Sequence, residues 1–247
     1  MARARSRPRV PPRPARFGPA RAAAALVLAA AVLAGCDALP WPEADGPPAP
    51  PSPSAPPPAP AADPPTGAEV ERARALLRAA EVAPEGSGAG YEREEFGSSW
   101  IDADGNGCPT RHDVLARDLR RTRVADDCTV LRGVLEDPYT GERIEFTAED
   151  PMEVQIDHVV PLALAWRTGA REWDGDTRVA FANDPGNLIA ADGPANQSKG
   201  DSGPGEWRPY PPFRCSYAVT YIGVIDEYGL WLPPDDHAAL GAMLRTC

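Results

Sequence analysis

The chain has 247 residues, with 25 Lys or Arg against 36 Asp or Glu, and its formal net charge is −11 at pH 7. Phosphate neutralisation by Lys and Arg supplies most non-specific attraction to nucleic acid. This charge therefore argues against a binding module that relies on a generally basic surface. It leaves open a protein that captures an anionic substrate locally, through a bound cation.

Residues 1–35 are typical of a secretory signal. They carry seven Arg and no acid, followed by an Ala/Val/Leu run that is short for a membrane span and by Gly35 and Cys36. The run LAGC at residues 33–36 resembles the lipobox of bacterial lipoproteins, in which the Cys is lipidated and becomes the N-terminus. We expect export and a lipid anchor at Cys36, with a plain signal peptide as the alternative. Without the seven Arg, 18 basic side chains face 36 acidic ones, a net charge near −18.

Residues 36–67 are rich in Pro and Ala, a composition that favours a disordered spacer. Residues 68–247 suit one compact domain. Four Cys remain in it, and an even number in an exported chain favours two disulfides, with three pairings possible. We favour Cys108–Cys128 and Cys215–Cys247, because each closes a local segment. No CxxC spacing supports a zinc site.

The N-terminal part of this domain begins with a helical spacing of apolar residues over 69–82. A Gly-rich loop at 84–90 follows, and then the sequence YEREEFGSSW at 91–100 mixes aromatic and charged residues. Such a mixture can stack on nucleic-acid bases, but a wall of the core is the more common outcome.

The sequence DADGNGCPTRHD at 102–113 matches the oxygen positions of a calcium-binding EF-hand loop through Asp102, Asp104, Asn106 and Asp113. Pro at position eight and Asp at position twelve depart from that pattern. A tight Asp/Asn/Gly turn is the alternative.

Thr110 is expected to cap a helix that runs to Val124. The region 128–146 predicts a β-hairpin around the turn DPYTGE, and a further strand leads to Asp157 and His158. Neighbouring side chains on a regular strand point to opposite faces. For both to reach one site the strand must end or bulge there, and Pro161 supports an ending.

The residues from 155 to 201 carry the groups needed to hold a hard cation against a phosphodiester. His158 suits the role of a general base near neutral pH. Asp157 and Asn196 offer oxygen ligands, which favour Mg²⁺, with Mn²⁺ or Ca²⁺ as alternatives. Lys199, the only Lys in the sequence, is assigned to the phosphate or to developing charge, and Asn187 to the loop that carries His158. Asp192 is expected to cap a short helix that presents Asn196 and Lys199 on one face and ends at Gly200.

Together DHVVPL and NDPGNLIAADGPANQSKGD resemble the HNH, or ββα-metal, endonuclease family, in its form with Asn in place of the third His. The surrounding pattern from Tyr91 to Cys247 is similar to secreted bacterial HNH proteins related to the C-terminal nuclease domain of GmrSD-type restriction enzymes. The resemblance implies His158 as general base, Asp157 and Asn196 as metal ligands and Asn187 as the structural Asn. The paired CxxC knuckles of many HNH domains are absent, and disulfides are expected to replace them.

We therefore expect an α+β fold with a ββα-metal core, additional helices and two disulfides. The favoured function is an exported, membrane-anchored, metal-dependent endonuclease acting on DNA or RNA. Its partners are a nucleic-acid substrate and, through the lipid only, a membrane; the sequence identifies no protein partner. The alternative is a calcium-stabilised cell-surface interaction module with a non-catalytic HNH frame.

Overall fold

The computed structural model describes residues 64–247; the predicted signal segment, Cys36 and most of the predicted spacer lie outside the described residues. The first helix, α1 (Gly67–Ala79), begins with a capping box in which Thr66 and Glu69 bond each other's backbone N–H. This helix starts two residues earlier than the apolar spacing predicts. Its buried Val70, Ala73 and Leu77 lie on one face.

The described part has the α+β fold that the sequence predicts, with small antiparallel sheets among helices. After α1 the elements are η1 (Arg93–Phe96), α2 (Thr110–Asp118), β1 (Arg120–Val124), β2 (Val130–Glu136), β3 (Arg143–Thr147), β4 (Val154–His158), α3 (Leu162–Arg167), η2 (Ala170–Glu172), α4 (Gly175–Asn183), β5 (Leu188–Asp192), α5 (Gly193–Lys199), η3 (Pro211–Phe213), α6 (Arg214–Tyr228) and α7 (Pro234–Leu244).

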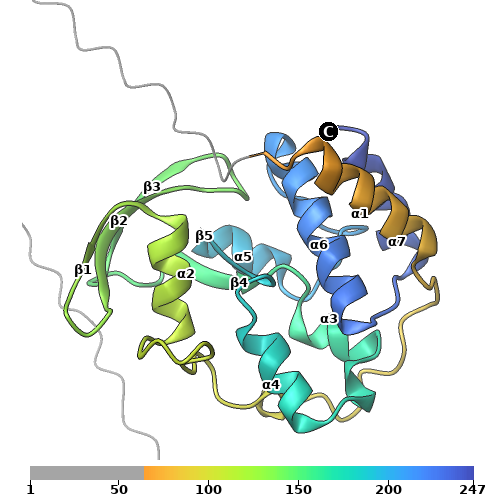
Figure 1. Ribbon diagram of the computed structural model, residues 1–247, viewed down its shortest axis with the longest axis horizontal. Coiled ribbons are helices and arrows are strands. Elements are labelled where there is room, and N and C mark those ends of the chain that lie inside the picture. Colours follow the sequence, from red (N-terminus) through yellow and green to blue (C-terminus); the bar gives the residue numbers. More distant parts are fainter. Residues whose placement is uncertain (1–63) are drawn as a thin grey trace, which may run out of the picture. The chain divides into compact units, whose positions relative to one another are not determined.

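Strands β1, β2 and β3 form one sheet with β2 in the middle, and α2 packs beside it (Figure 1). The β2–β3 hairpin confirms the prediction for 128–146. The prediction of one helix from Thr110 to Val124 was wrong, because α2 ends at Asp118 and the next residues pair with β2. Sheet pairing overrides helical spacing here. Leu119 packs directly over Gly133, where an added Cβ would lie 2.6 Å from a Leu119 methyl carbon.

Strands β4 and β5 pair antiparallel and lead directly into α5, which packs on both strands. As predicted, Asp192 caps α5 by accepting a hydrogen bond from the N–H of Ala195, and the helix ends before Gly200. Gly193 permits the close approach of α5 to the turn before β4, because a Cβ there would lie 2.2 Å from the backbone oxygen of Met152. The β4–β5–α5 unit is the ββα arrangement that the sequence predicts.

Two apolar cores flank this unit. One lies among α2, the three-stranded sheet and the inner face of β4 and β5, and the other joins α1, α3, α6 and α7. Helices α1, α6 and α7 pack together in Figure 1. The disulfides are Cys108–Cys128 and Cys215–Cys247, with Cα separations of 5.6 and 5.2 Å. Within residues 64–247 no helix has the length and apolar character to cross a membrane.

Candidate active site

A cavity of about 620 Å³ opens where β4 ends, beside the start of α3 and the end of α5. Its walls also include the segment that precedes α2, so distant parts of the chain meet there. The residues that line it are Gly88, Tyr91, Arg93, Gln155, Ile156, Asp157, His158, Pro161, Leu162, Ala163, Arg167, Asn196, Gly200 and Asp201. The cavity therefore brings together three of the five residues predicted for the site, Asp157, His158 and Asn196.

His158 is the last residue of β4, so the strand ends where the sequence required it to end. The imidazole is buried, and Nε2 lies 2.8 Å from the backbone oxygen of Ala182. Because a carbonyl oxygen only accepts, Nε2 carries the proton and Nδ1 keeps its lone pair. Burial lowers the pKa of His158 to about 4. The ring is therefore neutral at pH 7, with Nδ1 available as a base.

The indole of Trp100 stacks on His158, with ring centroids 6.3 Å apart and planes inclined by 14°. Together with the bond to Ala182, this stacking fixes the orientation of the imidazole. A fixed ring is what a general base requires, because proton transfer depends on geometry before it depends on pKa.

Asp157 precedes His158 on β4 and receives two hydrogen bonds at the same carboxylate oxygen. The hydroxyl of Tyr139 donates to Oδ2 at 2.5 Å, and the ammonium of Lys199 lies 2.8 Å from Oδ2. Burial and the neighbouring carboxylate raise the pKa of Tyr139 well above its usual value, so the phenol keeps its proton and donates. These bonds leave Oδ1 without a partner among the described residues, on a side chain that lines the cavity.

Asn196 lies on α5 and also lines the cavity. Its amide nitrogen donates to Oε1 of Gln155 at 3.0 Å, which orients the amide and leaves its oxygen as an acceptor. Asp157 and Asn196 thus contribute oxygen atoms from a strand and a helix to one cavity. Among residues 64–247, no group of three or more His, Cys, Asp and Glu side chains is arranged to hold a metal ion.

Asn187 is fully buried and does not line the cavity. Its side chain accepts a hydrogen bond from the N–H of Val160 and donates one to the carbonyl of the same residue. The backbone oxygen of Asn187 also accepts from the N–H of Val159. Asn187 therefore braces the chain directly after His158.

Lys199 does not lie at the cavity, where the predicted contact with phosphate would require it. It is only 1% exposed and is absent from the cavity wall. Its ammonium donates to the backbone oxygen of His158 at 2.9 Å, in addition to its bond with Asp157. Lys199 thus contacts both residues of the Asp-His pair and holds them in place.

Arg93 supplies a cation at the cavity that the sequence prediction missed. It is exposed at the start of η1, lines the cavity near His158, and is held by no hydrogen bond or ion pair within the described residues. The YEREEFGSSW segment thus forms a wall of the site, with Phe96 buried in the core. The only sequence signal was the basic residue between two aromatic ones.

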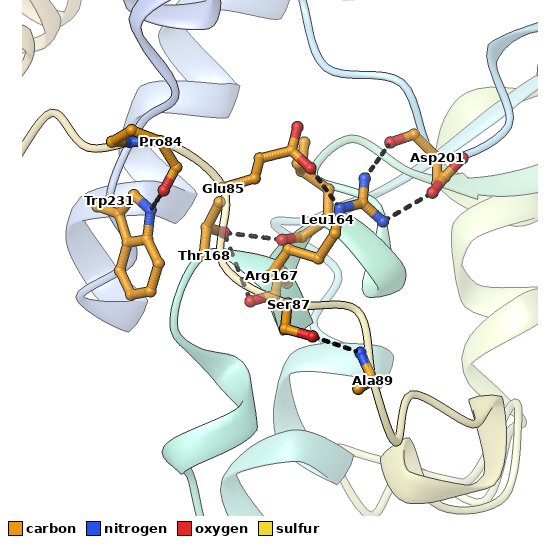
Figure 2. A network of polar contacts seen from close by, with 10 residues as sticks. Pro84, Glu85, Ser87, Ala89, Leu164, Arg167, Thr168, Asp201 and Trp231 are labelled. Carbon is orange, nitrogen blue, oxygen red and sulfur yellow. Dashed lines mark hydrogen bonds and ion pairs between the residues drawn. The ribbon is translucent and has the colours of Figure 1, made fainter.

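Arg167 fixes the rim of the cavity by joining three parts of the chain. Its guanidinium bonds Glu85 from the N-terminal segment and Asp201 from the residues after α5 (Figure 2). The same segment is tied down by the indole N–H of Trp231, which donates to the backbone oxygen of Pro84 at 3.1 Å (Figure 2). These contacts explain how a segment distant in sequence becomes a fixed wall of the site.

The loop at 102–113 is separate from the cavity, and N–H donors of the loop bond its acidic oxygens. Asp102 accepts from the N–H of Gly107, while the Asn106 amide donates to Asp104 and Asp113. The structure therefore shows an Asx-type turn network at this position, closed by the nearby Cys108 disulfide.

Residues 110–242 match the family described as GmrSD restriction endonucleases, C-terminal domain. The chain belongs to this family. The match contains β4, β5, α5 and all five predicted site residues, whereas Arg93 and the loop at 102–109 precede it. The chain is also 39% identical over 187 residues to a protein of Arthroderma benhamiae described as "Uncharacterized secreted protein", covering 74% of this chain and 89% of that protein. No solved structure matches the chain.

Proposed function

We propose that this member of the GmrSD C-terminal domain family is a metal-dependent HNH endonuclease that hydrolyses phosphodiester bonds of DNA or RNA. The observation that carries the proposal is the cavity at the end of β4. There an imidazole with an unprotonated Nδ1 lies beside two oxygen ligands and an unpaired guanidinium. Phosphodiester hydrolysis needs a base for water, charge neutralisation on the phosphoryl oxygens and a fixed geometry.

The donor chemistry of the cavity fits one hard divalent cation, with Mg²⁺ favoured. Asp157 offers Oδ1 because Tyr139 and Lys199 occupy Oδ2, and Asn196 offers its amide oxygen because Gln155 accepts from its nitrogen. Oxygen ligands with room for water suit Mg²⁺, Mn²⁺ or Ca²⁺ better than zinc or copper. When bound, the cation would polarise the scissile phosphate.

Side chains of the protein supply the base, the charge neutralisation and the positioning that the reaction also needs. Nδ1 of His158 takes the proton from the attacking water, while Ala182 and Trp100 hold the ring. Arg93 neutralises the non-bridging phosphoryl oxygens. Asn187 and Lys199 act through the backbone of the loop and through Asp157, so they position the catalytic groups.

The proposal includes export. The N-terminal signal pattern and the printed description of the Arthroderma benhamiae relative as secreted support it. We further propose residues 1–35 as a lipoprotein signal, lipidation at Cys36, residues 36–67 as a spacer and residues 68–247 as the nuclease domain. This arrangement places the enzyme on the outer face of a membrane.

The test is cleavage of supercoiled plasmid by the purified protein with Mg²⁺, Mn²⁺, Ca²⁺ or EDTA. Nicking should require a divalent metal and should be lost in His158→Ala. The matched control is His237→Ala, because His237 bonds the backbone oxygen of Leu77 on α1 and does not line the cavity. Calorimetric titration of the protein with Mg²⁺ gives a second readout, and Asp157→Asn should weaken binding at least tenfold.

Retention of metal-dependent cleavage in His158→Ala would contradict the assigned base. If plasmid and single-stranded RNA both stay intact with every metal while calcium raises the melting temperature, the calcium-stabilised surface module becomes the better explanation. In that case substitution of Asp102 and Asp104, rather than of Asp157, should abolish the calcium effect.

A further inference from the structure

The edge strand β1 and the central strand β2 carry a group of exposed Arg side chains away from the cavity. Arg121 and Arg123 lie on β1 and Arg132 on β2, and all three are exposed. No hydrogen bond or ion pair holds these three within the described residues. They are referred to below as the arginine face.

Two members of the arginine face are directly opposed across the sheet. Arg123 pairs with Arg132 in the β1–β2 register. Cross-strand neighbours have Cβ atoms about 5 Å apart on one face of the sheet, and like charges in such a pair repel. The positive charge of the face also contrasts with the chain as a whole, whose net charge is −11. An unpaired positive cluster on an acidic protein fits a polyanionic partner.

The backbone of β1 is irregular where it carries the arginine face. Its pairing with β2 shifts register between Arg120 and Arg123, and Arg121 adopts a left-handed φ of 52°. Arg121 and Arg123 thus lie at a sheet edge, since β1 is the outer strand. The acids within the three strands, Glu136 and Glu145, lie within ion-pair distance of Arg143.

The turn between β2 and β3 connects the arginine face rigidly to the cavity. Within this turn Tyr139 bonds Asp157, and Asp137 accepts a hydrogen bond from the N–H of Asp192. At a rise of 3.4 Å per residue, the part of β2 between Arg132 and the turn is about 15 Å long. Duplex DNA rises about 3.4 Å per base pair, so this length of strand corresponds to roughly four base pairs. Figure 1 shows this sheet extending to one side of β4, β5 and α5.

We propose that the arginine face binds the phosphate backbone of duplex nucleic acid beside the bond that enters the cavity. This inference rests on the proposed nuclease function and adds where its substrate is held. Such contacts carry no sequence information and fix the register of the duplex. They would give an acidic protein local affinity for a polyanion without a generally basic surface.

The test is fluorescence anisotropy of a labelled 20-base-pair duplex in EDTA, titrated with the protein at NaCl concentrations from 50 to 200 mM. EDTA separates binding from cleavage, so a failed nuclease proposal and a failed binding proposal give different results. The variant is Arg123→Gln/Arg132→Gln. Arg123→Lys/Arg132→Lys keeps the charge, and Arg72→Gln/Arg78→Gln makes the same charge change on exposed residues of α1.

The Gln pair should weaken binding at 50 mM salt by about tenfold or more and make the slope of log K against log salt less negative by about two. The Lys pair should keep the wild-type slope, and the α1 pair should stay within about twofold of wild type. The Gln pair should melt no lower than wild type, because it removes a repulsive pair. Equal binding by the Gln pair and the α1 pair would overturn the proposal. So would a wild-type protein that binds phosphatidylglycerol vesicles through this face but not the duplex.

Discussion

The ammonium of Lys199 lies 2.8 Å from Oδ2 of Asp157 and 2.9 Å from the backbone oxygen of His158. The single Lys of the sequence therefore contacts both members of the Asp-His pair without lining the cavity. Burial lowers the pKa of Lys199, and the Asp157 carboxylate counteracts part of that shift. The positions of Asp157 and of the His158 backbone therefore both depend on Lys199.

Replacement of Lys199 by Met should destabilise the protein by about 3 kcal/mol, because removal of one partner leaves a buried charge unpaired. Asp157→Asn together with Lys199→Met should cost clearly less than the sum of the single changes. Urea unfolding of the four proteins in a double-mutant cycle measures this coupling. Additive single effects would show that the two groups do not interact in solution.

Asn187→Ala should remove both side-chain bonds to Val160 and leave two buried backbone groups without partners. The expected cost is about 2–3 kcal/mol in unfolding free energy. Under the proposed function, cleavage should fall at least tenfold in kcat with little change in KM, because the loop that carries His158 moves. Asn183→Ala is the control, since its amide bonds the backbone of Ile101 and Val179 and lies outside the cavity wall. A kcat unchanged in Asn187→Ala would contradict the positioning role.

The parts of the site predicted correctly from the sequence depend on local patterns. The end of β4 at His158 followed from the Asp-His pair and Pro161, and the start of α5 followed from Asp192 as its cap. Each pattern lies within a few residues of the feature it determines. The preference for Cys108–Cys128 and Cys215–Cys247 also rested on local segments, and the structure contains those disulfides.

What the sequence could not predict depends on contacts between distant segments. The sequence predicts that the Lys199 ammonium contacts phosphate. In the structure Lys199 is buried and forms an ion pair with Asp157, which lies 42 positions earlier in the chain. Arg93 reaches the cavity only because Arg167 ties the preceding segment to Asp201. The residues after Asp118 continue a helical spacing, but pairing with β2 makes them a strand. In each case tertiary contacts outweigh the local pattern.

Arg93→Gln should lower kcat/KM about 100-fold under the proposed function, because it removes a cation that faces the phosphoryl oxygens. Arg93→Lys should recover part of the loss, since it keeps the charge without the planar fork. The melting temperature should not change, because no hydrogen bond or ion pair among the described residues holds Arg93 in the fold. Arg74→Gln on α1 is the control for loss of one positive charge. Equal kcat/KM in Arg93→Gln and Arg74→Gln would show that Arg93 does not contribute to cleavage.

Two buried acid-base groups should act in opposite directions on stability between pH 4 and 6.5. The pKa of His158 falls from 6.5 to about 4 through burial, so the unfolded state binds more protons in this window and stability declines as pH falls. Burial raises the pKa of Asp236 from 3.8 to about 6, so the folded state binds more protons and stability grows as pH falls. The two contributions partly cancel in the wild-type protein.

Asp236→Asn should separate these contributions. Asp236 lies in the first turn of α7, where Oδ1 accepts from the N–H of Gly205 and Oδ2 is buried without a partner. The Asn variant should gain about 1–2 kcal/mol at pH 7, where the wild-type carboxylate is charged. It should then lose stability steadily as pH falls to 4, because the His158 contribution is no longer offset. Asp235→Asn, an exposed change in the same helical turn, controls for charge at the helix start. Urea unfolding at pH 4, 5, 6 and 7 distinguishes the variants, and parallel pH curves for Asp236→Asn and wild type would show that Asp236 does not titrate in this range.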